Sequence, residues 1–292
     1  MQINLAKSAG FCFGVKRALD VALKAANTKK EICMLGDIVH NEEVVKKIEK
    51  TGIKKIKHLK KTKDKTLLIR AHGTSLATFN KAKNCGYEII DATCPMVCEI
   101  HKIVRECERK GYAIIIIGDQ KHDEVQGISG QLKNKPIIID PVKNNSFKKF
   151  KKIKKAAVVA QSTQNLQKTL RIVKALKKYT FKLTFFNTIC RPTQIKQKEI
   201  KIMPLKNDIM IIIGSKSSAN TKRLYEISKS LNNSTFWIQS KKGLKPKWFN
   251  GTKTVGITAG ASTPDSTTKN IIKYIQRINS KRKMLSSRGK YS

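Results

Sequence analysis

Short apolar runs alternate with amphipathic stretches along most of this 292-residue chain. The runs are rich in β-branched side chains, which is typical of buried strands. Between them apolar residues recur at helical spacing, as Val15, Ala18 and Ala22 do in the predicted helix 15–26. Strands that alternate with helices predict parallel sheets and an α/β fold. The predicted strands are 31–35, 66–70, 87–90, 113–117, 136–140, 156–160, 182–186, 208–213, 234–238 and 253–257.

The pattern also repeats at long range. Two loops, GDIVHNEEV and GDQKHDEV, begin 82 residues apart, and two cysteines are separated by the same 82 residues. A further step of 96 residues leads from the second cysteine and the second loop to a third of each. This register favours repetition of one α/β unit over the general similarity of α/β segments. The pairs, each 24 residues apart, are Cys12 and Gly36, Cys94 and Gly118, and Cys190 and Gly214.

A second set of polar loops, RAHGTS, AQSTQ and TAGAST, begins at Arg70, Ala160 and Thr258. Loops at the carboxyl ends of parallel strands bind the ligands of open α/β sheets, so both sets are expected to line a site. We therefore predict three similar small parallel-sheet α/β units in a pseudo-threefold arrangement around a central cavity. The predicted units are 13–94, 95–191 and 192–280, with 1–12 joining the third and 281–292 forming a basic, disordered tail.

The net charge is +41, and 51 of the 61 basic residues are lysines. Lysines are spread along the whole chain with few aromatic residues beside them, which favours biased composition over a nucleic-acid-binding groove. A basic field would still attract an anionic substrate or an acidic redox partner. No apolar run is long enough to span a bilayer, and the first residues do not resemble a secretory signal. The cytoplasm, or an equivalent reducing compartment, is the expected location.

Seven cysteines without a CxxC pair disfavour a disulfide framework, a zinc ribbon and a thioredoxin-type motif. The three repeated cysteines, Cys12, Cys94 and Cys190, each precede a predicted helix, where free N–H groups stabilise the thiolates that iron requires. Three ligands instead of four would leave one coordination site open, which is typical of catalysis. Cys98 is the alternative fourth ligand, although it lies outside the repeat. The other cysteines, Cys33, Cys85 and Cys107, are interpreted as core or incidental.

The repeated loops hold most of the remaining polar chemistry. Imidazoles, hydroxyls and amides at helix N-termini suit a diphosphate. A carboxylate among donors for an anion suits proton transfer better than binding, which points to Glu124, with Glu42 at the matching position of the first unit. The predicted donors are His40, His72, His122, Ser162, Thr163, Ser218, Asn220 and Ser262.

Nine motifs in order, from Ala9 to Asp265, resemble the LytB/IspH family of 4-hydroxy-3-methylbut-2-enyl diphosphate reductases. The family catalyses the last step of the methylerythritol phosphate pathway of isoprenoid biosynthesis. The matching stretches cover nearly the whole chain. They are AGFCFGV, LGDIVHNEEVV, AHG, DATCP, GDQKHDEV, AQSTQ, NTICRPTQ, GSKSSAN and TAGASTPD.

The resemblance implies a three-lobed α/β fold and a [4Fe–4S] cluster on Cys12, Cys94 and Cys190, with one open iron that the substrate hydroxyl reaches. Glu124 would deliver protons and Thr163 would orient the hydroxyl. Two electrons from a flavodoxin or ferredoxin-type donor would then remove the hydroxyl as water, giving isopentenyl and dimethylallyl diphosphate. No nucleic acid and no membrane is expected as a partner. The implied diphosphate ligands are His40, His72, His122, Ser218, Asn220 and Ser262.

Three positions depart from the family pattern. Ala219 replaces a serine that normally contacts the diphosphate, which removes a hydrogen bond worth roughly 1.5–3 kcal/mol unless water substitutes. Asp123 replaces a proline and places a carboxylate beside Glu124, where it is expected to alter the pKa of Glu124. Ser162 stands where threonine is common and keeps the hydroxyl. None of these changes removes a predicted cluster ligand.

Three other functions compete with this interpretation. A dehydratase would use the same open cluster without net reduction. A basic nucleic-acid-binding protein would keep the cysteines as structural residues and would bind with a steep salt dependence. An α/β scaffold with a Cys/His zinc site would contain zinc and no inorganic sulfide.

Overall fold

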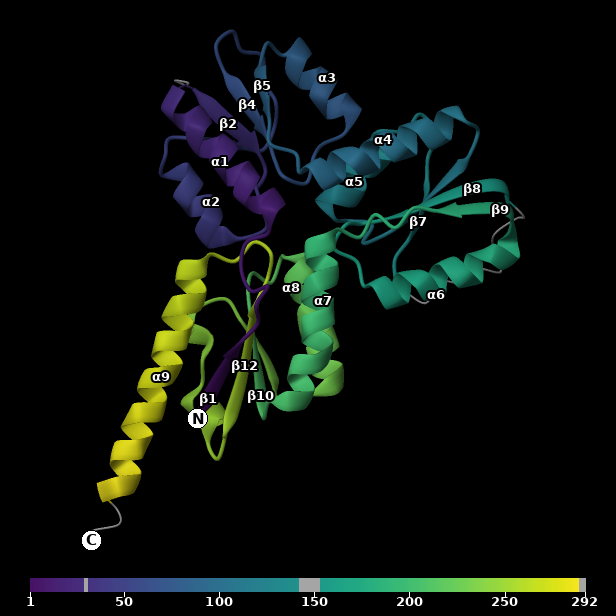
Figure 1. Cartoon of the computed structure of the whole chain (residues 1–292). Coiled ribbons are helices and arrows are strands. Elements are labelled where there is room, and N and C mark those ends of the chain that lie inside the picture. The colour runs from purple at the N-terminus through teal and green to yellow at the C-terminus, as the bar shows by residue number, and fades with distance from the viewer. Residues whose placement is uncertain (29–30, 142–152, 289–292) are drawn as a thin grey trace. The chain divides into compact units, whose positions relative to one another are not determined.

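The computed structural model describes residues 1–28, 31–141 and 153–288, and their side chains as far as Ser280. In these residues twelve strands form three sheets of four, and every pair of neighbouring strands is parallel (Figure 1). The predicted α/β class with three parallel-sheet units is confirmed.

The three sheets share one strand order. The first has the order β3-β2-β4-β5 and the second the order β7-β6-β8-β9, while the third has the order β11-β10-β12-β1. The strands are β1 (Gln2–Leu5), β2 (Ile32–Leu35), β3 (Lys54–Ile56), β4 (Thr66–Ile69), β5 (Glu88–Asp91), β6 (Ala113–Ile117), β7 (Ile137–Ile139), β8 (Ile153–Ala160), β9 (Thr180–Phe185), β10 (Ile209–Ile213), β11 (Thr235–Ile238) and β12 (Thr254–Ala259).

Helices connect most of the consecutive strands, as is usual for parallel sheets, whereas β3 leads to β4 without one. Short 3-10 turns occur at Lys177–Tyr179, Met203–Lys206, Lys241–Gly243 and Pro246–Phe249. The α-helices are α1 (Phe13–Thr28), α2 (Glu42–Glu49), α3 (Leu76–Asn84), α4 (Pro95–Arg109), α5 (Asp123–Ser129), α6 (Leu166–Leu176), α7 (Arg191–Ile202), α8 (Ala219–Leu231) and α9 (Asp265–Arg288).

The third sheet shows how its strands and helices form a core. The five residues of β10, IMIII, are all buried, which is typical of a parallel strand covered on both faces. Successive side chains of a strand point to opposite faces. Ile211 therefore packs with Ile271 of α9, whereas Met210 packs with Ile200 of α7 and Leu224 of α8. In Figure 1, α9 and α7 accordingly lie on opposite sides of this sheet.

The second sheet is built in the same way. Ile116 of β6 packs with Val104 of α4 and Val125 of α5, on one face of the sheet. Ile115 of the same strand packs with Val173 of α6, on the other face. The alternation decides which side chains of a strand pack against the helices on each face.

In the third sheet β1 takes the place that β5 and β9 take in the other two, because it pairs with β12 at the edge of the sheet. Residues 2–5 are thus joined to a sheet formed otherwise by residues 209–259. Cys12 follows β1 as Cys94 follows β5 and Cys190 follows β9, so the three cysteines are equivalent in topology as well as in sequence.

The chain forms two compact units. The terminal unit comprises Met1–Cys12, His40–Val44 and Gln194–Ser292 and contains the third sheet, and the central unit comprises Phe13–Val39 and Val45–Thr193 and contains the first two sheets. The terminal helix α9 continues to Arg288, so the predicted disordered tail from residue 281 overlaps a helix there, and residues 289–292 lie outside the described residues.

Candidate active site

The three repeated cysteines occupy equivalent places in their sheets. Each directly precedes a helix, α1, α4 or α7, as the sequence predicted. Each cysteine amide also donates a hydrogen bond to the carbonyl that lies two residues beyond the end of the sheet's third strand. These bonds run from Cys12 to Ala261 (3.1 Å), from Cys94 to Ala71 (3.0 Å) and from Cys190 to Ser162 (3.0 Å).

The Cys94 and Cys190 thiols each lie close to the first turn of a helix. Cys94 is the N-cap of α4 and its side chain makes no capping hydrogen bond. Pro95 has no N–H group and the Val97 N–H donates to the Cys94 carbonyl at 2.8 Å, so Met96 supplies the remaining backbone donor of the first turn. A β-carbon at Gly14 of α1 would lie 2.4 Å from Cys94 Sγ, so only glycine allows this close approach. Cys190 Sγ lies 3.1 Å from Thr193 Oγ1 in the first turn of α7.

The other cysteines have different surroundings. Burial raises the pKa of the Cys33 and Cys107 thiols, which lie in the cores beside the first and second sheets. Cys85 ends α3 and packs against the first of these cores. Cys98 lies one turn into α4, and desolvation raises the pKa of its thiol too. A thiol that holds its proton is a poor iron ligand.

Glu124 is the most buried acid of the predicted set, with 2% of its surface exposed. Its carboxylate accepts hydrogen bonds from the Ser162 amide (2.6 Å) and the Ser162 hydroxyl (2.8 Å). Burial raises the pKa of Glu124, and the two bonds from Ser162 offset part of that rise. Because the Ser162 carbonyl also accepts from the Cys190 amide, one residue joins the acid to a repeated cysteine.

Asp123 does not act on Glu124 as expected. Its carboxylate pairs with the Arg70 guanidinium at 2.6 Å. The pKa of Glu124 is shifted by burial and by Ser162, and Asp123 is not among the causes. The expectation that Asp123 alters the pKa of Glu124 is therefore wrong, because the neighbouring carboxylate is neutralised by an arginine from the RAHGTS loop.

His72 and His122 lie together in the central unit. Their rings meet edge to face with centroids 5.5 Å apart, and His122 Nδ1 accepts a hydrogen bond from the Glu124 amide at 3.1 Å. Gly73 has a φ of +72°, and a β-carbon there would lie 2.8 Å from the ring of His101. Burial and the charge of Arg105 lower the pKa of His101 to about 4, so this supporting ring is neutral at neutral pH.

Thr163 is held by the loop that follows β8. Gln161, which is fully buried, donates from Nε2 to Thr163 Oγ1 at 3.1 Å. The Oε1 of Gln161 accepts from the Asp119 amide at 3.0 Å and from Gln164 Nε2 at 3.2 Å. The AQSTQ loop is thereby fixed to the GDQKHDEV loop, and the Thr163 hydroxyl has a defined position.

The terminal unit holds the other predicted donors. Ser218 caps α8, because its Oγ accepts from the Thr221 amide at 3.3 Å. Asn220 Oδ1 accepts from the Ala261 amide at 3.0 Å, while its buried Nδ2 has no hydrogen-bond partner in the described part of the chain. A buried amide donor without a partner costs free energy, so Nδ2 suits an oxyanion ligand. Ser262 Oγ donates to the His40 carbonyl at 3.0 Å.

The comparisons with known proteins decide the family. A family model described as LytB protein matches residues 3–276, which is nearly the whole chain. The chain belongs to the LytB family.

Individual relatives of this LytB chain agree in length and fold. The 4-hydroxy-3-methylbut-2-enyl diphosphate reductase of Geotalea uraniireducens (strain Rf4) is 38% identical over 279 residues, which are 96% of this chain and 98% of the relative. A solved structure of (E)-4-hydroxy-3-methyl-but-2-enyl diphosphate reductase, the terminal enzyme of the non-mevalonate pathway, is 35% identical, with a TM-score of 0.69 over 95% of this chain and 100% of its own. A third relative, the E-1-hydroxy-2-methyl-but-2-enyl-4-diphosphate reductase structure from Plasmodium falciparum, is 28% identical, with a TM-score of 0.83 over 93% and 87%.

The LytB chain groups the predicted residues within each unit. The central unit brings together Cys190, Ser162, Glu124, His122 and His72 by the contacts above. In the terminal unit, Cys12, Asn220 and Ala261 are joined by hydrogen bonds, and Ser262 follows directly. Sequence reasoning missed Arg70 and Gln161 as supports, although both lie in the polar loops that the repeat identified.

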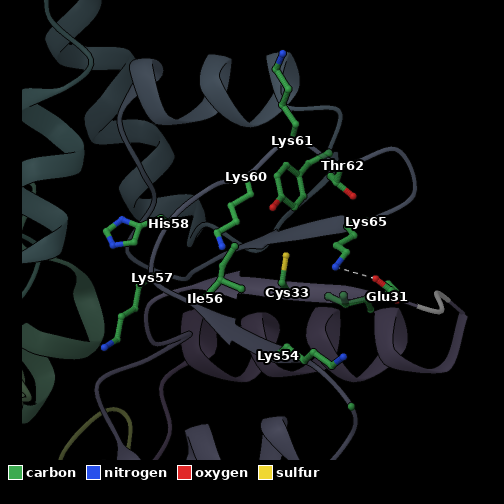
Figure 2. Close-up of a pocket in the computed structure, with 13 residues that line it drawn as sticks. Glu31, Cys33, Lys54, Ile56, Lys57, His58, Lys60, Lys61, Thr62 and Lys65 are labelled. Carbon is green, nitrogen blue, oxygen red and sulfur yellow. Dashed lines mark ion pairs between the residues drawn. The ribbon is translucent and has the colours of Figure 1, made fainter.

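A cavity of about 550 Å³ lies beside β2 and β3 of the LytB chain, and five of its 13 lining residues are lysines (Figure 2). Lys65 pairs with Glu31 at 3.1 Å, while Lys57 and Lys61 point away from Cys33 in Figure 2. The ammonium groups do not converge as a phosphate site requires, and none of the predicted site residues lines this cavity.

Among the described residues, none of the helices combines the length and the apolar character that crossing a membrane demands.

Proposed function

We propose that this chain reduces 4-hydroxy-3-methylbut-2-enyl diphosphate to isopentenyl and dimethylallyl diphosphate, as the final step of the non-mevalonate route to isoprenoids. The observation that carries the proposal is the buried Glu124, whose raised pKa suits a proton donor and which Ser162 connects to Cys190. Membership of the LytB family and the names of its relatives support the substrate and the reaction.

The cofactor in this proposal is a [4Fe–4S] cluster on Cys12, Cys94 and Cys190, with one iron left open. The donor set fits, because three thiols lie at equivalent places in their sheets, each directly before a helix. The close approach of Cys94 Sγ to Gly14, the second residue of α1, supports the same ligand set. When bound, the cluster supplies an electron relay and a Lewis-acidic iron.

The diphosphate is assigned to the polar loops. Ser218 at the start of α8 and the Asn220 Nδ2 donor supply a helix N-terminus and an amide for phosphate oxygens. Ser262, His40, His72 and His122 complete the proposed set of donors. Ala219 lies between Ser218 and Asn220 in the sequence and contributes no hydroxyl. The net positive charge of the chain favours binding of a substrate that carries a diphosphate.

Proton delivery is assigned to the Glu124 carboxyl. Breaking the carbon–oxygen bond releases the hydroxyl, which takes one proton and leaves as water, while two electrons and a second proton go to the allylic fragment. An acid must hold its proton at the working pH, and burial of Glu124 favours that form. The Thr163 hydroxyl, which Gln161 holds, orients the leaving hydroxyl of the substrate.

The electron donor in this proposal is a flavodoxin or ferredoxin-type protein with an acidic face. The net charge of +41 supports attraction to such a partner. A cytoplasmic location belongs to the proposal as well, because thiolates must remain reduced to bind iron.

The test is conversion of 4-hydroxy-3-methylbut-2-enyl diphosphate by the anaerobically purified protein with a low-potential chemical reductant. We expect both isoprenoid diphosphates and a strict need for the reductant. Conversion without any reductant would identify a dehydratase instead. Stoichiometric zinc without sulfide, or steeply salt-dependent nucleic-acid binding in place of turnover, would also refute the proposal.

A further inference from the structure

Lys196 is a buried lysine, with 3% of its surface exposed, on the second turn of α7. Its ammonium donates hydrogen bonds to the carbonyls of Gly10 and Ala259, at 3.1 Å each, and to the carbonyl of Ser8. These acceptors match in number the three N–H donors of an ammonium. Burying an ammonium costs free energy unless it is hydrogen-bonded in this way. The fold therefore depends on Lys196 keeping these contacts.

Glu199, about one turn further along α7, contacts the same segment. Its carboxylate accepts from the Ser8 amide at 3.1 Å and from the Ser8 hydroxyl. Two side chains of α7 therefore contact the carbonyl, the amide and the hydroxyl of Ser8. Residues 8–10 lead directly to Cys12, so these side chains act on the backbone that carries the first repeated cysteine.

This segment has weaker backbone support than its counterpart in the first sheet. The Gly10 amide lies 3.5 Å from the Ala259 carbonyl, whereas the equivalent bond from Ala92 to Ile69 is 3.1 Å. Gly10 also has a φ of +94°, and because glycine tolerates both positive and negative φ, its backbone can change conformation more readily than that of other residues. Lys196 donates to the carbonyls of both Gly10 and Ala259, and so links the two residues that the 3.5 Å backbone hydrogen bond joins only weakly.

We propose that Lys196 and Glu199 are positioning residues that fix the Cys12 thiol for the bound cofactor. The role of Cys12 as a ligand rests on the proposed function, whereas the hold on residues 8–10 does not. Without the ammonium, three carbonyls lose a charged donor and the segment opens more often. The Cys12 amide then loses its bond to Ala261 more often, and the thiol leaves its place ahead of α1.

The test compares cysteine reactivity in the full chain after anaerobic purification. The protein is treated with an iron chelator and iodoacetamide, and peptide mass spectrometry gives the alkylation rates of Cys12, Cys94 and Cys190. In Lys196→Met we expect the Cys12 rate to rise about tenfold, since hydrogen bonds to a charge are lost and local opening increases. Lys196→Arg should restore most of the protection. Lys198→Met is the matched control, because Lys198 is exposed on the same helix.

The other two cysteines decide between local positioning and general loosening. An equal rise at all three cysteines, or no rise at Cys12, would overturn the proposal. Glu199→Gln keeps the buried ammonium and provides a milder variant if Lys196→Met does not fold, and it should raise the Cys12 rate selectively by a smaller factor. If the wild type contains no iron or sulfide, the proposed function fails. A selective rise of the Cys12 alkylation rate would still support the contacts by which α7 fixes residues 8–10.

Discussion

The loops after β2 and β6 are equivalent in the 82-residue repeat, yet they use different residues to begin the following helix. After β6, His122 is the N-cap of α5, and its Nδ1 accepts from the Glu124 amide. After β2, Asn41 lies at the start of α2, and its Oδ1 accepts from the Val44 amide at 3.1 Å. Helix α5 therefore starts one repeat position earlier than α2.

This shift of one residue changes the direction in which the equivalent acids point. Each residue of an α-helix is rotated by about 100° from the one before it. Glu42, the first residue of α2, is exposed and accepts from Ser215 Oγ at 2.8 Å and Gln239 Nε2 at 3.2 Å. Glu124, the second residue of α5, is buried against Ser162. Acids at equivalent repeat positions therefore differ in burial where the following helix begins at a different residue.

The largest effect should come from Glu124→Gln, with Glu42→Gln as its matched control. Removal of a general acid costs about 10²–10⁴-fold in turnover. We expect a loss of that order in kcat for Glu124→Gln with iron and substrate binding retained, and a change of about twofold or less for Glu42→Gln. Steady-state kinetics under anaerobic conditions measure both. Equal losses of kcat in the two variants would contradict the assignment of proton delivery to Glu124 alone.

A smaller effect is expected for Ser162→Ala, which removes the hydroxyl bond to Glu124 and keeps the amide bond. The hydroxyl bond lowers the pKa of Glu124, so its loss raises that pKa further. A general acid works only while protonated, so the fall of kcat at high pH should move to higher pH. Ser162→Thr keeps a hydroxyl and should retain the wild-type profile. A shift of Ser162→Ala toward lower pH would contradict this assignment.

Asp123→Asn gives the second loop the residue that the first loop has at this position. It removes the ion pair with Arg70, in which the side chains are 22% and 32% exposed. Since such partly exposed pairs contribute about 1 kcal/mol or less, we expect a loss of stability of that size by denaturant unfolding. Arg70→Met should cost nothing more in the Asp123→Asn background. A large additional loss there would show that Arg70 acts elsewhere.

The pH dependence of stability gives the smallest expected effect. Burial raises the folded-state pKa of Glu124 above its unfolded value. Its contribution is therefore fully present below the unfolded pKa of about 4.3 and is lost as the pH rises through the folded pKa. Tm measured from low to neutral pH should fall more steeply in the wild type than in Glu124→Gln. A steeper fall in Glu124→Gln would reverse the assigned sign.

The fold could be predicted from the sequence wherever a strand is buried on both faces. All ten predicted strands exist, with ends shifted by a few residues. The sequence did not reveal β1 and β3, because the edge strands QINL and KKI carry too few apolar residues for a clear pattern. An edge strand needs only one partner, so its composition is less constrained than that of a central strand.

The repeat made the cysteines and loops predictable, because equivalent residues recur at fixed offsets. It could not show which side chains meet. Ser162 and Glu124 are 38 residues apart, Arg70 and Asp123 are 53 apart, and Lys196 lies 186 residues from Gly10. No periodicity links such pairs, since the packing of separate strands and helices brings them together.

The three-cysteine site is tested most directly by the iron and sulfide content after anaerobic purification of the wild type, Cys94→Ser and Cys98→Ser. We predict about four irons and four sulfides per chain in the wild type, as a [4Fe–4S] cluster requires. Cys98→Ser, one turn away on the same helix, should retain them, and Cys94→Ser should lose most of them. A wild type without iron and sulfide, or a Cys98→Ser variant that loses them as Cys94→Ser does, would contradict the three-cysteine site.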